Sequence, residues 1–337
     1  MKNTTDFAQL VTKFLTDYLP MKRNYSKNTI WSYKDTFKLF ATYLVEVKEI
    51  NLGNYTMQEF NKDIIIEFLE WLRERGNSIN TTNQRLAAIK TFAYFAQVED
   101  IEHIAGLQKI NQIKSKKTQS REIKFLTVEQ MSKLINLPNS NRKIELKHKV
   151  VLCLLYDTGA RVQEICDLTI GDIILGNHPK IRLRGKGNKI RTVPITSNMN
   201  ELLEEYMDAF RYQQTLRDRY LIQNIHNNKM SRDGVEYIIK KYASIASEED
   251  PTFPSKVHPH MFRHSKAMHM LAANIHIVYI RDFLGHEDIS TTMIYARADT
   301  TLKEAAINKL APKIIEVEDY PDWTRDKDLL DFLKKFK

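Results

Sequence analysis

The sequence predicts a mainly helical protein of two domains, the second of which carries one small antiparallel sheet. Apolar residues recur at helical spacing through most of the 337-residue chain. Two short alternating segments, 180–184 and 189–195, flank the glycine-containing turn 185–188, and this pattern is typical of a hairpin. The length is sufficient for two ordinary domains, each with its own core.

The first domain, residues 1–108, is predicted as a bundle of four short helices with aromatic faces. Ser26 is suited to cap the second helix, because serine hydroxyls accept hydrogen bonds from free backbone N–H groups. Gly76 is suited to end the third helix, and the fourth begins near Thr81. A small helical bundle is therefore expected.

Residues 109–124 break this pattern and are predicted as a basic linker. They hold six basic residues, one acidic residue and few large apolar ones. Such a segment either lies along a negatively charged partner or is simply a solvated, charged connection. Both interpretations stay open at this point.

The second domain is predicted over residues 125–311. Thr127 and Gln130 have the spacing of a capping box at the start of a helix. Further helices are expected over 144–157 and 162–168, then the hairpin, then mainly helices from about 198 to 311. The predicted fold class is therefore mainly α, with a helical bundle followed by a mixed α+β domain.

Residues 312–337 form an acidic tail in which apolar side chains are interleaved. Between Glu316 and Asp331 there are seven acidic residues and two basic ones. The tail is either mobile or a segment that docks on a neighbouring subunit or on its own domain.

Composition narrows the class of partner. Lys and Arg number 51 against 42 Asp and Glu, a net charge of +9, which favours polyanionic partners such as nucleic acid. Cys153 and Cys166 form no disulfide framework, which fits a reducing cytoplasm. No run of about 18 apolar residues is present, and the first residues lack an apolar leader pattern, so neither a membrane span nor a secretory signal is expected.

Two cationic features stand early in the second domain. Arg161, within the string 158–164, is placed at a turn that opens a helix, where backbone N–H groups and a guanidinium can both face an anion. Lys186 lies between two glycines at the hairpin tip, where a flexible loop presents a proton donor. A glycine hairpin with surface lysines is the plainer interpretation of the second feature.

Three more features follow towards the end of this domain. His260 and Arg263, three residues apart, share a helix face. His286 comes just after a predicted helix end, and Tyr295 lies in a helix that Ser290 is expected to cap. Taken singly, each is as easily a surface or core residue.

A catalytic metal is not expected. His260 and His264 have the spacing of a ligand pair, but Met261 stands where a metalloprotease motif has glutamate. The neighbouring sequence also lacks the carboxylates that such a site needs.

Taken in order, these features resemble the tyrosine recombinase (phage integrase) family. The resemblance is carried by TGARVQEICDLTIGDI at 158–173, RGKGNKIRTVPI at 184–195, HPHMFRHSKAMHML at 258–271 and FLGHEDISTTMIYAR at 283–297. The segment YSKNTIWSYKDTFKLFATYL at 25–44 is similar to the helical, SAM-like core-binding domain of that family. The resemblance extends over nearly the whole chain up to about residue 312.

The resemblance implies a role for each feature in cutting and rejoining DNA through a 3′-phosphotyrosine. The implied residues are the phosphate-clamping arginines Arg161 and Arg263, the proton donor Lys186, the phosphate-contacting and acid–base histidines His260 and His286, the supporting Glu164, and the nucleophile Tyr295. Two guanidiniums can stabilise the charge on phosphorus without a metal, and a phosphotyrosine conserves the bond energy, so no cofactor and no ATP are expected.

The family also implies how DNA is held. The expected partner is double-stranded DNA with short inverted-repeat sites. The two domains of each protomer are expected to clamp the DNA. The protein is expected to be a homotetramer on DNA and a monomer without it. The candidate DNA contacts are Thr81, Asn83, Arg85, Lys90, Lys114, Lys116 and Lys117.

Two other functions use related parts. A type IB topoisomerase shares the chemistry but lacks site preference, and a non-catalytic DNA-binding protein would have a broken catalytic position, whereas all are filled here. Integration, excision, transposition and chromosome-dimer resolution are not distinguished by the sequence.

Overall fold

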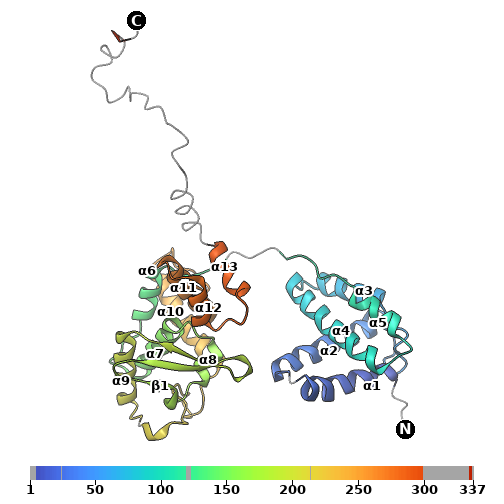
Figure 1. Ribbon diagram of the computed structural model, residues 1–337, viewed down its shortest axis with the longest axis horizontal. Helices are drawn as coiled ribbons and strands as arrows, with labels where there is room; N and C mark the ends of the chain where they lie inside the picture. The colour runs from blue at the N-terminus through green and yellow to red at the C-terminus, as the bar shows by residue number, and fades with distance from the viewer. Residues whose placement is uncertain (1–4, 24, 119–122, 213, 299–333, 336–337) are drawn as a thin grey trace. The chain divides into compact units, whose positions relative to one another are not determined.

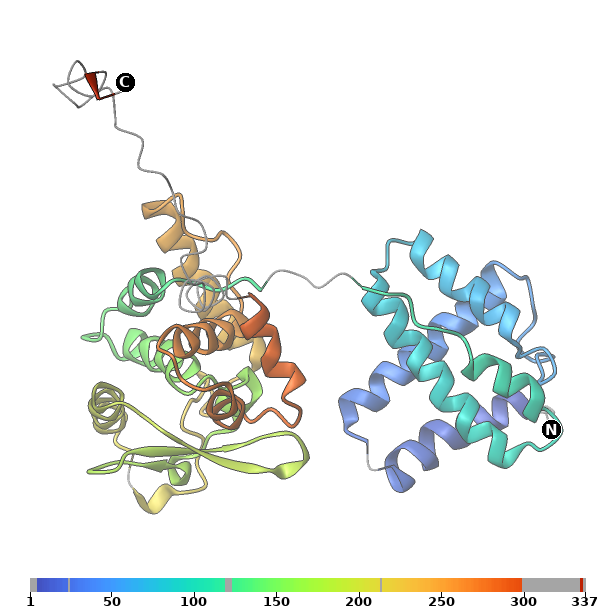
Figure 2. The ribbon, with the colours of Figure 1, turned by 45° about the horizontal axis from the view of Figure 1, so that its top comes forward.

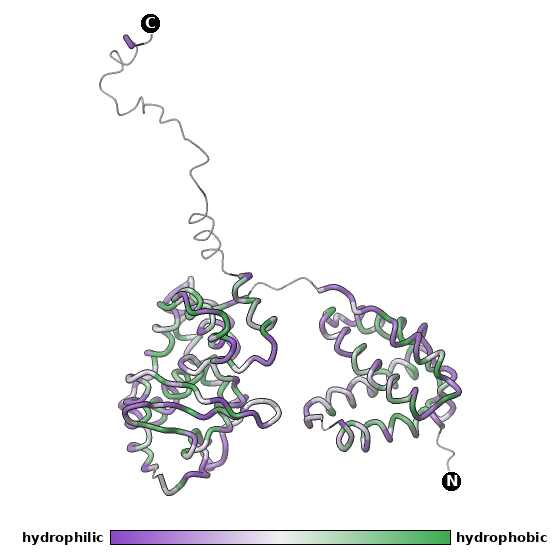
Figure 3. The backbone as a smooth tube through the Cα atoms, viewed as in Figure 1, coloured by the Kyte–Doolittle hydropathy of each residue, from purple (hydrophilic) through white to green (hydrophobic). Residues whose placement is uncertain are grey.

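The chain forms two compact units, residues 1–121 and 122–337, each built mainly of helices (Figure 1). The computed structural model describes residues 5–23, 25–118, 123–212, 214–298 and 334–335. Hydrophobic and hydrophilic residues alternate along the helices of both units, as expected for helices that bury one face (Figure 3). The predicted fold class, mainly helical with one small antiparallel sheet, is confirmed.

The first unit is a helical bundle with an aromatic core. Its helices are α1 (Asp6–Lys13), the π-helical η1 (Phe14–Lys22), α2 (Lys27–Glu46), α3 (Lys62–Glu74), α4 (Ile79–Glu99) and α5 (Ile104–Asn111). Ser26 caps α2 as predicted, and Asn61 and Ser78 cap α3 and α4 in the same way. Phe14, Phe37 and Phe92 pack edge to face in the core, with ring centroids 5.1–6.0 Å apart.

The bundle extends further along the chain than the sequence predicted. Helix α5 was not expected, and its Leu107 and Ile110 are fully buried in the bundle core. Just beyond it, the Asn83 side chain exchanges two hydrogen bonds with the backbone of Lys116, at 2.9 and 3.0 Å. The first part of the segment predicted as a linker therefore belongs to the first unit, because two buried apolar residues outweigh its basic composition.

The second unit packs helices against a three-stranded sheet (Figure 2). Its helices are α6 (Val128–Asn136), α7 (Lys143–Asp157), α8 (Val162–Asp167), α9 (Ser197–Ala209), α10 (Arg232–Glu249), α11 (Pro259–Ala272), α12 (Ile277–Leu284) and α13 (Ser290–Ala298), with short 3-10 turns η2 (Ile170–Asp172), η3 (Lys186–Asn188) and η4 (Gln214–Leu216). Helix α7 contributes a run of buried residues to the main core. The predicted capping box of Thr127 and Gln130 is present at α6.

The sheet has the order β1-β2-β3, with β1 (Ile173–Ile174), β2 (Lys180–Arg184) and β3 (Ile190–Pro194) all antiparallel. The β2–β3 hairpin was predicted; β1 was not, because two residues carry no readable alternation. The register pairs Leu183 with Arg191 and Arg184 with Ile190, so the hairpin tip follows directly. Gly187 and Asn188 both have positive φ there, which the tight turn requires.

Helix ends place the candidate site residues. Arg161 is the N-cap of α8, and Pro259 opens α11, so His260 lies in its first turn. Gly285 ends α12 in the left-handed conformation at φ 65°, which turns the chain towards His286. The prediction that Ser290 caps α13 is wrong: Ser290 is inside the helix, and its backbone N–H donates to the Asp288 carboxylate at 2.8 Å.

Two predictions concern the end of the chain. The end of the helical region expected up to residue 311, from 299 onward, and most of the acidic tail lie outside the described residues. Among the helices that are described, none has the length and apolar character needed to cross a membrane.

Candidate active site

Glu164 lies at the centre of a hydrogen-bonded cluster with two arginines. Its carboxylate accepts hydrogen bonds from the Arg161 backbone N–H at 2.8 Å and from the Arg161 guanidinium at 3.0 Å. Arg191, on β3, donates both terminal nitrogens to the same carboxylate at 2.8 Å each. Burial works to raise the pKa of Glu164, but the hydrogen bonds and charge of Arg191, with Arg161, bring that pKa below its ordinary value. Glu164 is therefore ionised and fixes Arg161 in place.

Arg263 is buried behind this cluster. Only 3% of it is exposed, and its guanidinium donates to the carbonyls of Gly159 and Leu284 at 2.7 Å each. Burial and the charges of Arg161 and Arg191 lower the pKa of Arg263 to about 10, which still leaves it charged at neutral pH. The two carbonyls hold the guanidinium between the α7–α8 turn and the end of α12.

The hairpin reaches the same region. The backbone of Lys186 lies in the turn η3 at the tip, and its side chain lies outside the described part of the structure. Lys189, after the tip, forms an exposed ion pair with Glu287 at 2.6 Å. This pair connects the hairpin to the loop between α12 and α13.

The two predicted histidines have different surroundings. His286 shares a hydrogen bond between its Nδ1 and the Thr292 hydroxyl at 2.8 Å. Burial, followed by Arg263, Arg161 and Arg191, lowers the pKa of His286 to about 4. The pKa of His260 is lowered as well, first by burial and then by neighbouring positive charge. Both imidazoles are therefore neutral at pH 7 in this DNA-free protein.

Tyr295 is buried, with 1% of its surface exposed. Its hydroxyl is 3.0 Å from Nδ1 of His264, and its ring lies nearly parallel to that of His286, with centroids 6.5 Å apart. Burial raises the pKa of Tyr295, while the charges of Arg263 and Arg161 work in the opposite direction. The tyrosine therefore lies within the electrostatic reach of both arginines.

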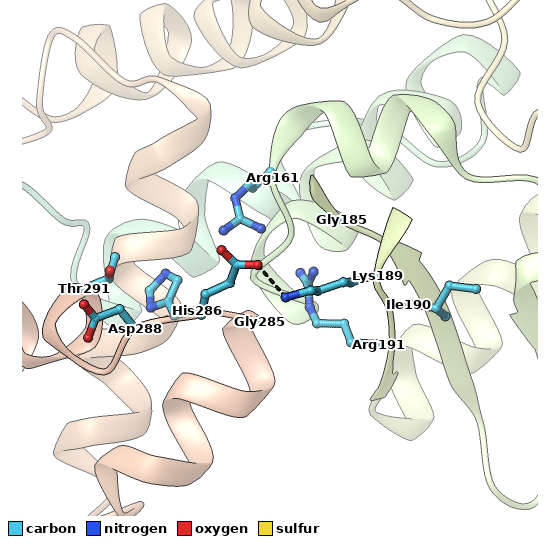
Figure 4. Close-up of a pocket in the computed structure, with 10 residues that line it drawn as sticks. Arg161, Gly185, Lys189, Ile190, Arg191, Gly285, His286, Asp288 and Thr291 are labelled. Carbon is cyan, nitrogen blue, oxygen red and sulfur yellow. Dashed lines mark hydrogen bonds and ion pairs between the residues drawn. The ribbon is translucent and has the colours of Figure 1, made fainter. Parts of the chain in front are cut away.

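A cavity of about 500 Å³ opens beside these residues (Figure 4). Its lining comes from α8, the hairpin and the α12–α13 loop: Arg161, Gly185, Lys189, Ile190, Arg191, Gly285, His286, Glu287, Asp288 and Thr291. Cationic groups dominate one wall, so the cavity is suited to an anion such as a phosphodiester. The predicted Arg161 and His286 line it, whereas Glu164, Arg263 and Tyr295 are not among its lining residues.

Three residues in this arrangement were not predicted. Arg191, His264 and Thr292 all lie within the quoted family strings, and Thr292 stands three residues before Tyr295. Strand alternation in RTVPI is the signal that places Arg191 on the same side as Val193. The contact between His264 and Tyr295 joins α11 to α13 and has no sequence signal.

No metal-binding cluster is present among the residues that the structure describes. There, no group of three or more His, Cys, Asp or Glu side chains is arranged to hold an ion. His260 and His264 are adjacent on α11, with ring centroids 6.3 Å apart.

The candidate DNA contacts of the first unit divide into two groups. Arg85 is engaged internally with Ser32, Thr36 and Asp35 on α2, the last at 2.5 Å. Asn83 is engaged with Lys116, as described above, and the Thr81 hydroxyl bonds to that of Ser78. The exposed side chains are those of Lys114, Lys116 and Lys117, while Lys90 is half-buried.

Comparison with known proteins gives the class. Residues 124–301 match the family model described as Phage integrase family, and residues 12–100 match that of the Phage integrase, N-terminal SAM-like domain. The putative integrase/recombinase y4rC of Sinorhizobium fredii is 30% identical over 314 residues, covering 93% of this chain and 94% of that protein. Tyrosine recombinase XerC of Herpetosiphon aurantiacus is 33% identical over 317 residues, covering 92% and 98%.

Solved structures show the same fold. The XerH site-specific recombinase bound to palindromic difH substrate matches with a TM-score of 0.68 at 20% identity, covering 91% of this chain and 90% of that chain. The Tn1549 transposon integrase in complex with transposon right end DNA matches with a TM-score of 0.68 at 17% identity, covering 90% and 99%.

The two family models and the relatives together define a DNA-recombining enzyme. The chain belongs to the phage integrase family and is a site-specific tyrosine recombinase that acts on DNA.

Proposed function

We propose that this enzyme cuts and rejoins DNA strands through a 3′-phosphotyrosine formed on Tyr295. The observation that carries the proposal is the position of Tyr295 within the electrostatic reach of Arg263 and Arg161, the second of which lines the cavity. A phosphotyrosine conserves the energy of the broken phosphodiester, so strands are rejoined without ATP.

The other residues act on the phosphate. Arg161 and Arg263 neutralise the charge that develops on the non-bridging oxygens, with Glu164 holding Arg161 in place. Lys186 supplies the proton to the departing 5′ oxygen, and His260 and His286 contact the phosphate and assist proton transfer. His260 and His286 are neutral without DNA because their pKa values are lowered. A bound, negatively charged phosphate raises these pKa values, and the histidines can then hold the proton that their roles require. Two guanidiniums suffice for this chemistry, and we expect no metal or other cofactor.

The buried position of Tyr295 means that DNA binding must bring the phosphate and the hydroxyl together. A nicked suicide duplex, which loses its leaving strand after cleavage, should trap a covalent adduct on Tyr295. Tyr295→Phe should bind the duplex normally and trap nothing. Tyr279→Phe is the matched control, because Tyr279 is 68% exposed on α12 and should cleave normally.

An adduct that persists in Tyr295→Phe would assign the nucleophile to another residue. Cleavage should also continue in excess chelator, because the arginines stabilise the phosphorane charge. Abolished cleavage that a divalent ion restores would contradict the metal-free mechanism.

A topoisomerase-like activity is the second candidate, since it uses the same covalent chemistry. Relaxation of supercoiled plasmids without a recombination site, at the rate seen with a site, would favour it. A non-catalytic DNA-binding role is disfavoured because every catalytic position is occupied.

DNA is gripped, in this proposal, by both units, with exposed Lys114, Lys116 and Lys117 on phosphates and Thr81 and Lys90 contributing from α4. Asn83 and Arg85 would support this surface through their internal contacts while presenting their remaining polar edges. Four protomers would act on a pair of short inverted-repeat sites, with a monomer in the absence of DNA. The biological role of this recombination is integration, excision, transposition or dimer resolution, in the cytoplasm.

A further inference from the structure

His264 follows Arg263 directly on α11, and its side chain turns towards α13. Its Nδ1 lies 3.0 Å from the Tyr295 hydroxyl oxygen, which is hydrogen-bond distance. The two rings are tilted by 59°, with centroids 5.7 Å apart, so the contact is made at the edge of the imidazole. The hydroxyl that is to attack phosphorus therefore already meets an imidazole nitrogen.

We propose that His264 is a further catalytic residue, which accepts the hydrogen bond of the Tyr295 hydroxyl and takes its proton as the phosphotyrosine bond forms. This inference rests on the proposed role of Tyr295 as the nucleophile. A tyrosine hydroxyl is a weak nucleophile until its proton is drawn away, so a base at the oxygen accelerates the attack.

The other histidines are arranged for different work. The Nδ1 of His286 is engaged by Thr292, and its ring is within 11° of parallel to the Tyr295 ring, so it faces the flat side of the tyrosine. His260 lies one turn before His264, with the ring centroids 6.3 Å apart. Of these three imidazoles, that of His264 has a nitrogen at the hydroxyl.

The protonation state of His264 suits a proton acceptor. Burial, followed by the charges of His260, His258 and Arg263, lowers the pKa of His264 to about 4. At neutral pH the ring is neutral, and Nδ1 can offer its lone pair. The groups that face it are these three from α11 and its N-cap, Tyr295 from α13 and His286 from the preceding loop. A phosphate bound beside Arg263 opposes the surrounding positive charge and makes proton uptake easier.

The step balances without any additional reactant. The O–H bond of Tyr295 breaks, its proton passes to Nδ1 of His264, and the tyrosine oxygen bonds to phosphorus. The bond from phosphorus to the 5′ oxygen breaks, and that oxygen takes a proton from the acid assigned above to Lys186. On rejoining, a 5′ hydroxyl attacks phosphorus, Tyr295 departs, and His264 returns its proton.

The arrangement tolerates the movement that the buried tyrosine requires. The charge of Arg263 acts on the His264 ring, so a phosphate held by Arg263 lies within electrostatic reach of His264. Movement of Tyr295 towards that phosphate therefore keeps its hydroxyl beside α11.

The test compares two substitutions in single-turnover cleavage of the nicked suicide duplex between pH 6 and 9. His264→Asn keeps an acceptor near the position of Nδ1 but cannot take a proton, and His264→Leu removes the acceptor. Both should bind DNA normally and cleave about 100-fold more slowly at pH 7, the usual contribution of a general base. The deficit should shrink about tenfold for each pH unit, as ionisation of the tyrosine replaces the missing base. His276→Asn, at an exposed histidine, should cleave normally.

A duplex with sulfur in place of the 5′ bridging oxygen separates attack from departure, because a thiolate leaves without a proton. It should rescue Lys186→Ala and leave His264→Asn slow. Four results with His264→Asn would each overturn the inference. They are cleavage at the normal rate, cleavage faster than normal, a deficit that does not change with pH, and rescue by the sulfur-containing duplex. Each of these leaves the proposed function standing if the adduct maps to Tyr295, whereas an adduct elsewhere would overturn both.

Discussion

Arg191 and Glu164 form a two-pronged ion pair, with each terminal guanidinium nitrogen 2.8 Å from a different carboxylate oxygen. The same carboxylate holds the backbone and side chain of Arg161. The orientation of Arg161 in the cavity wall thus depends on an arginine 30 residues away in sequence, on β3. Lysine could not replace Arg191, because it lacks the planar fork.

Glu164→Gln should therefore impair both folding and catalysis. The substitution removes the negative charge that compensates a partly buried guanidinium. In comparable cases, the loss of one partner of a buried ion pair lowers the free energy of unfolding by about 3 kcal/mol. We expect a lower urea midpoint and suicide-duplex cleavage reduced by about tenfold or more, since Arg161 loses its support. Glu236→Gln, in an exposed pair with Lys240, should change stability by less than about 1 kcal/mol. Cleavage that is unchanged in Glu164→Gln would show that Arg161 holds its position unaided.

Gly285→Ala should reduce cleavage by about tenfold or more. Gly285 has φ 65°, and a Cβ at this position would lie 2.8 Å from Cδ of Arg191, so both the backbone and the guanidinium must shift. Gly76→Ala is the matched control, because Gly76 has φ 83° and open space around it. Both variants should lose about 1–2 kcal/mol from left-handed strain. Equal cleavage by the two variants would show that the contact with Arg191 does not matter.

Neutralising Lys114, Lys116 and Lys117 to Gln should weaken binding to all DNA sequences alike. If each contacts one phosphate, the slope of log affinity against log salt should become shallower by about 3. Replacing exposed Lys62, Lys143 and Lys180 changes the net charge equally and should affect the slope far less. Fluorescence anisotropy at several salt concentrations measures both. A slope that does not change in the first variant would place these lysines away from the duplex.

Stability should fall as the pH decreases from 6.5 to 5, before carboxylates titrate. Burial, as the largest cause, lowers the pKa values of His148, His264 and His286 to about 4. Between pH 6.5 and 5 these histidines therefore bind protons in the unfolded chain and stay neutral in the folded protein. This stability is complete above pH 6.5 and declines as the pH falls towards 4, by about 1 kcal/mol per histidine down to pH 5 after allowance for solvent screening. Urea unfolding of His148→Asn should show a smaller decline. An equal decline in both proteins would exclude His148 as a contributor.

Truncation after residue 312 tests the acidic tail. If the tail docks on a neighbouring protomer, the truncated enzyme should bind one half-site normally and lose cooperative binding to a full site. If the tail instead covers its own catalytic domain, truncation should raise cleavage. Gel-shift and suicide-duplex assays separate the two results, and no change in either assay would exclude both roles.

The sequence predicted what depends on local chemistry. Ser26, Thr127 and Gly76 mark helix ends because capping hydroxyls and left-handed glycines act within a few residues. The hairpin was predicted from its alternation. Ser290 was assigned as a cap wrongly because Asp288, two residues earlier, offers a carboxylate to the same helix.

Contacts between distant segments could not be predicted in this way. The hydrogen bond between His264 and Tyr295 depends on how α11 and α13 pack. The ion pair between Arg191 and Glu164 depends on the register of β3. Helix α5 was missed because its basic neighbours obscured two buried apolar residues. Side-chain partners of this kind are set by tertiary packing.

The burial of Tyr295 has a consequence for the fidelity of the enzyme. If Tyr295 is the nucleophile, as proposed, its burial among Ala267, Leu271 and Ile280 shields it from chance encounters with genomic phosphodiesters. Its attack would then require the protein to rearrange, with the free energy for rearrangement supplied by contacts that the correct DNA sequence makes. Random sequence, which binds through its backbone alone, would occupy the enzyme without activating it. The enzyme would then select between DNA sequences at the cleavage step as well as at binding. This second selection would protect a chromosome that contains many sequences similar to the recombination site.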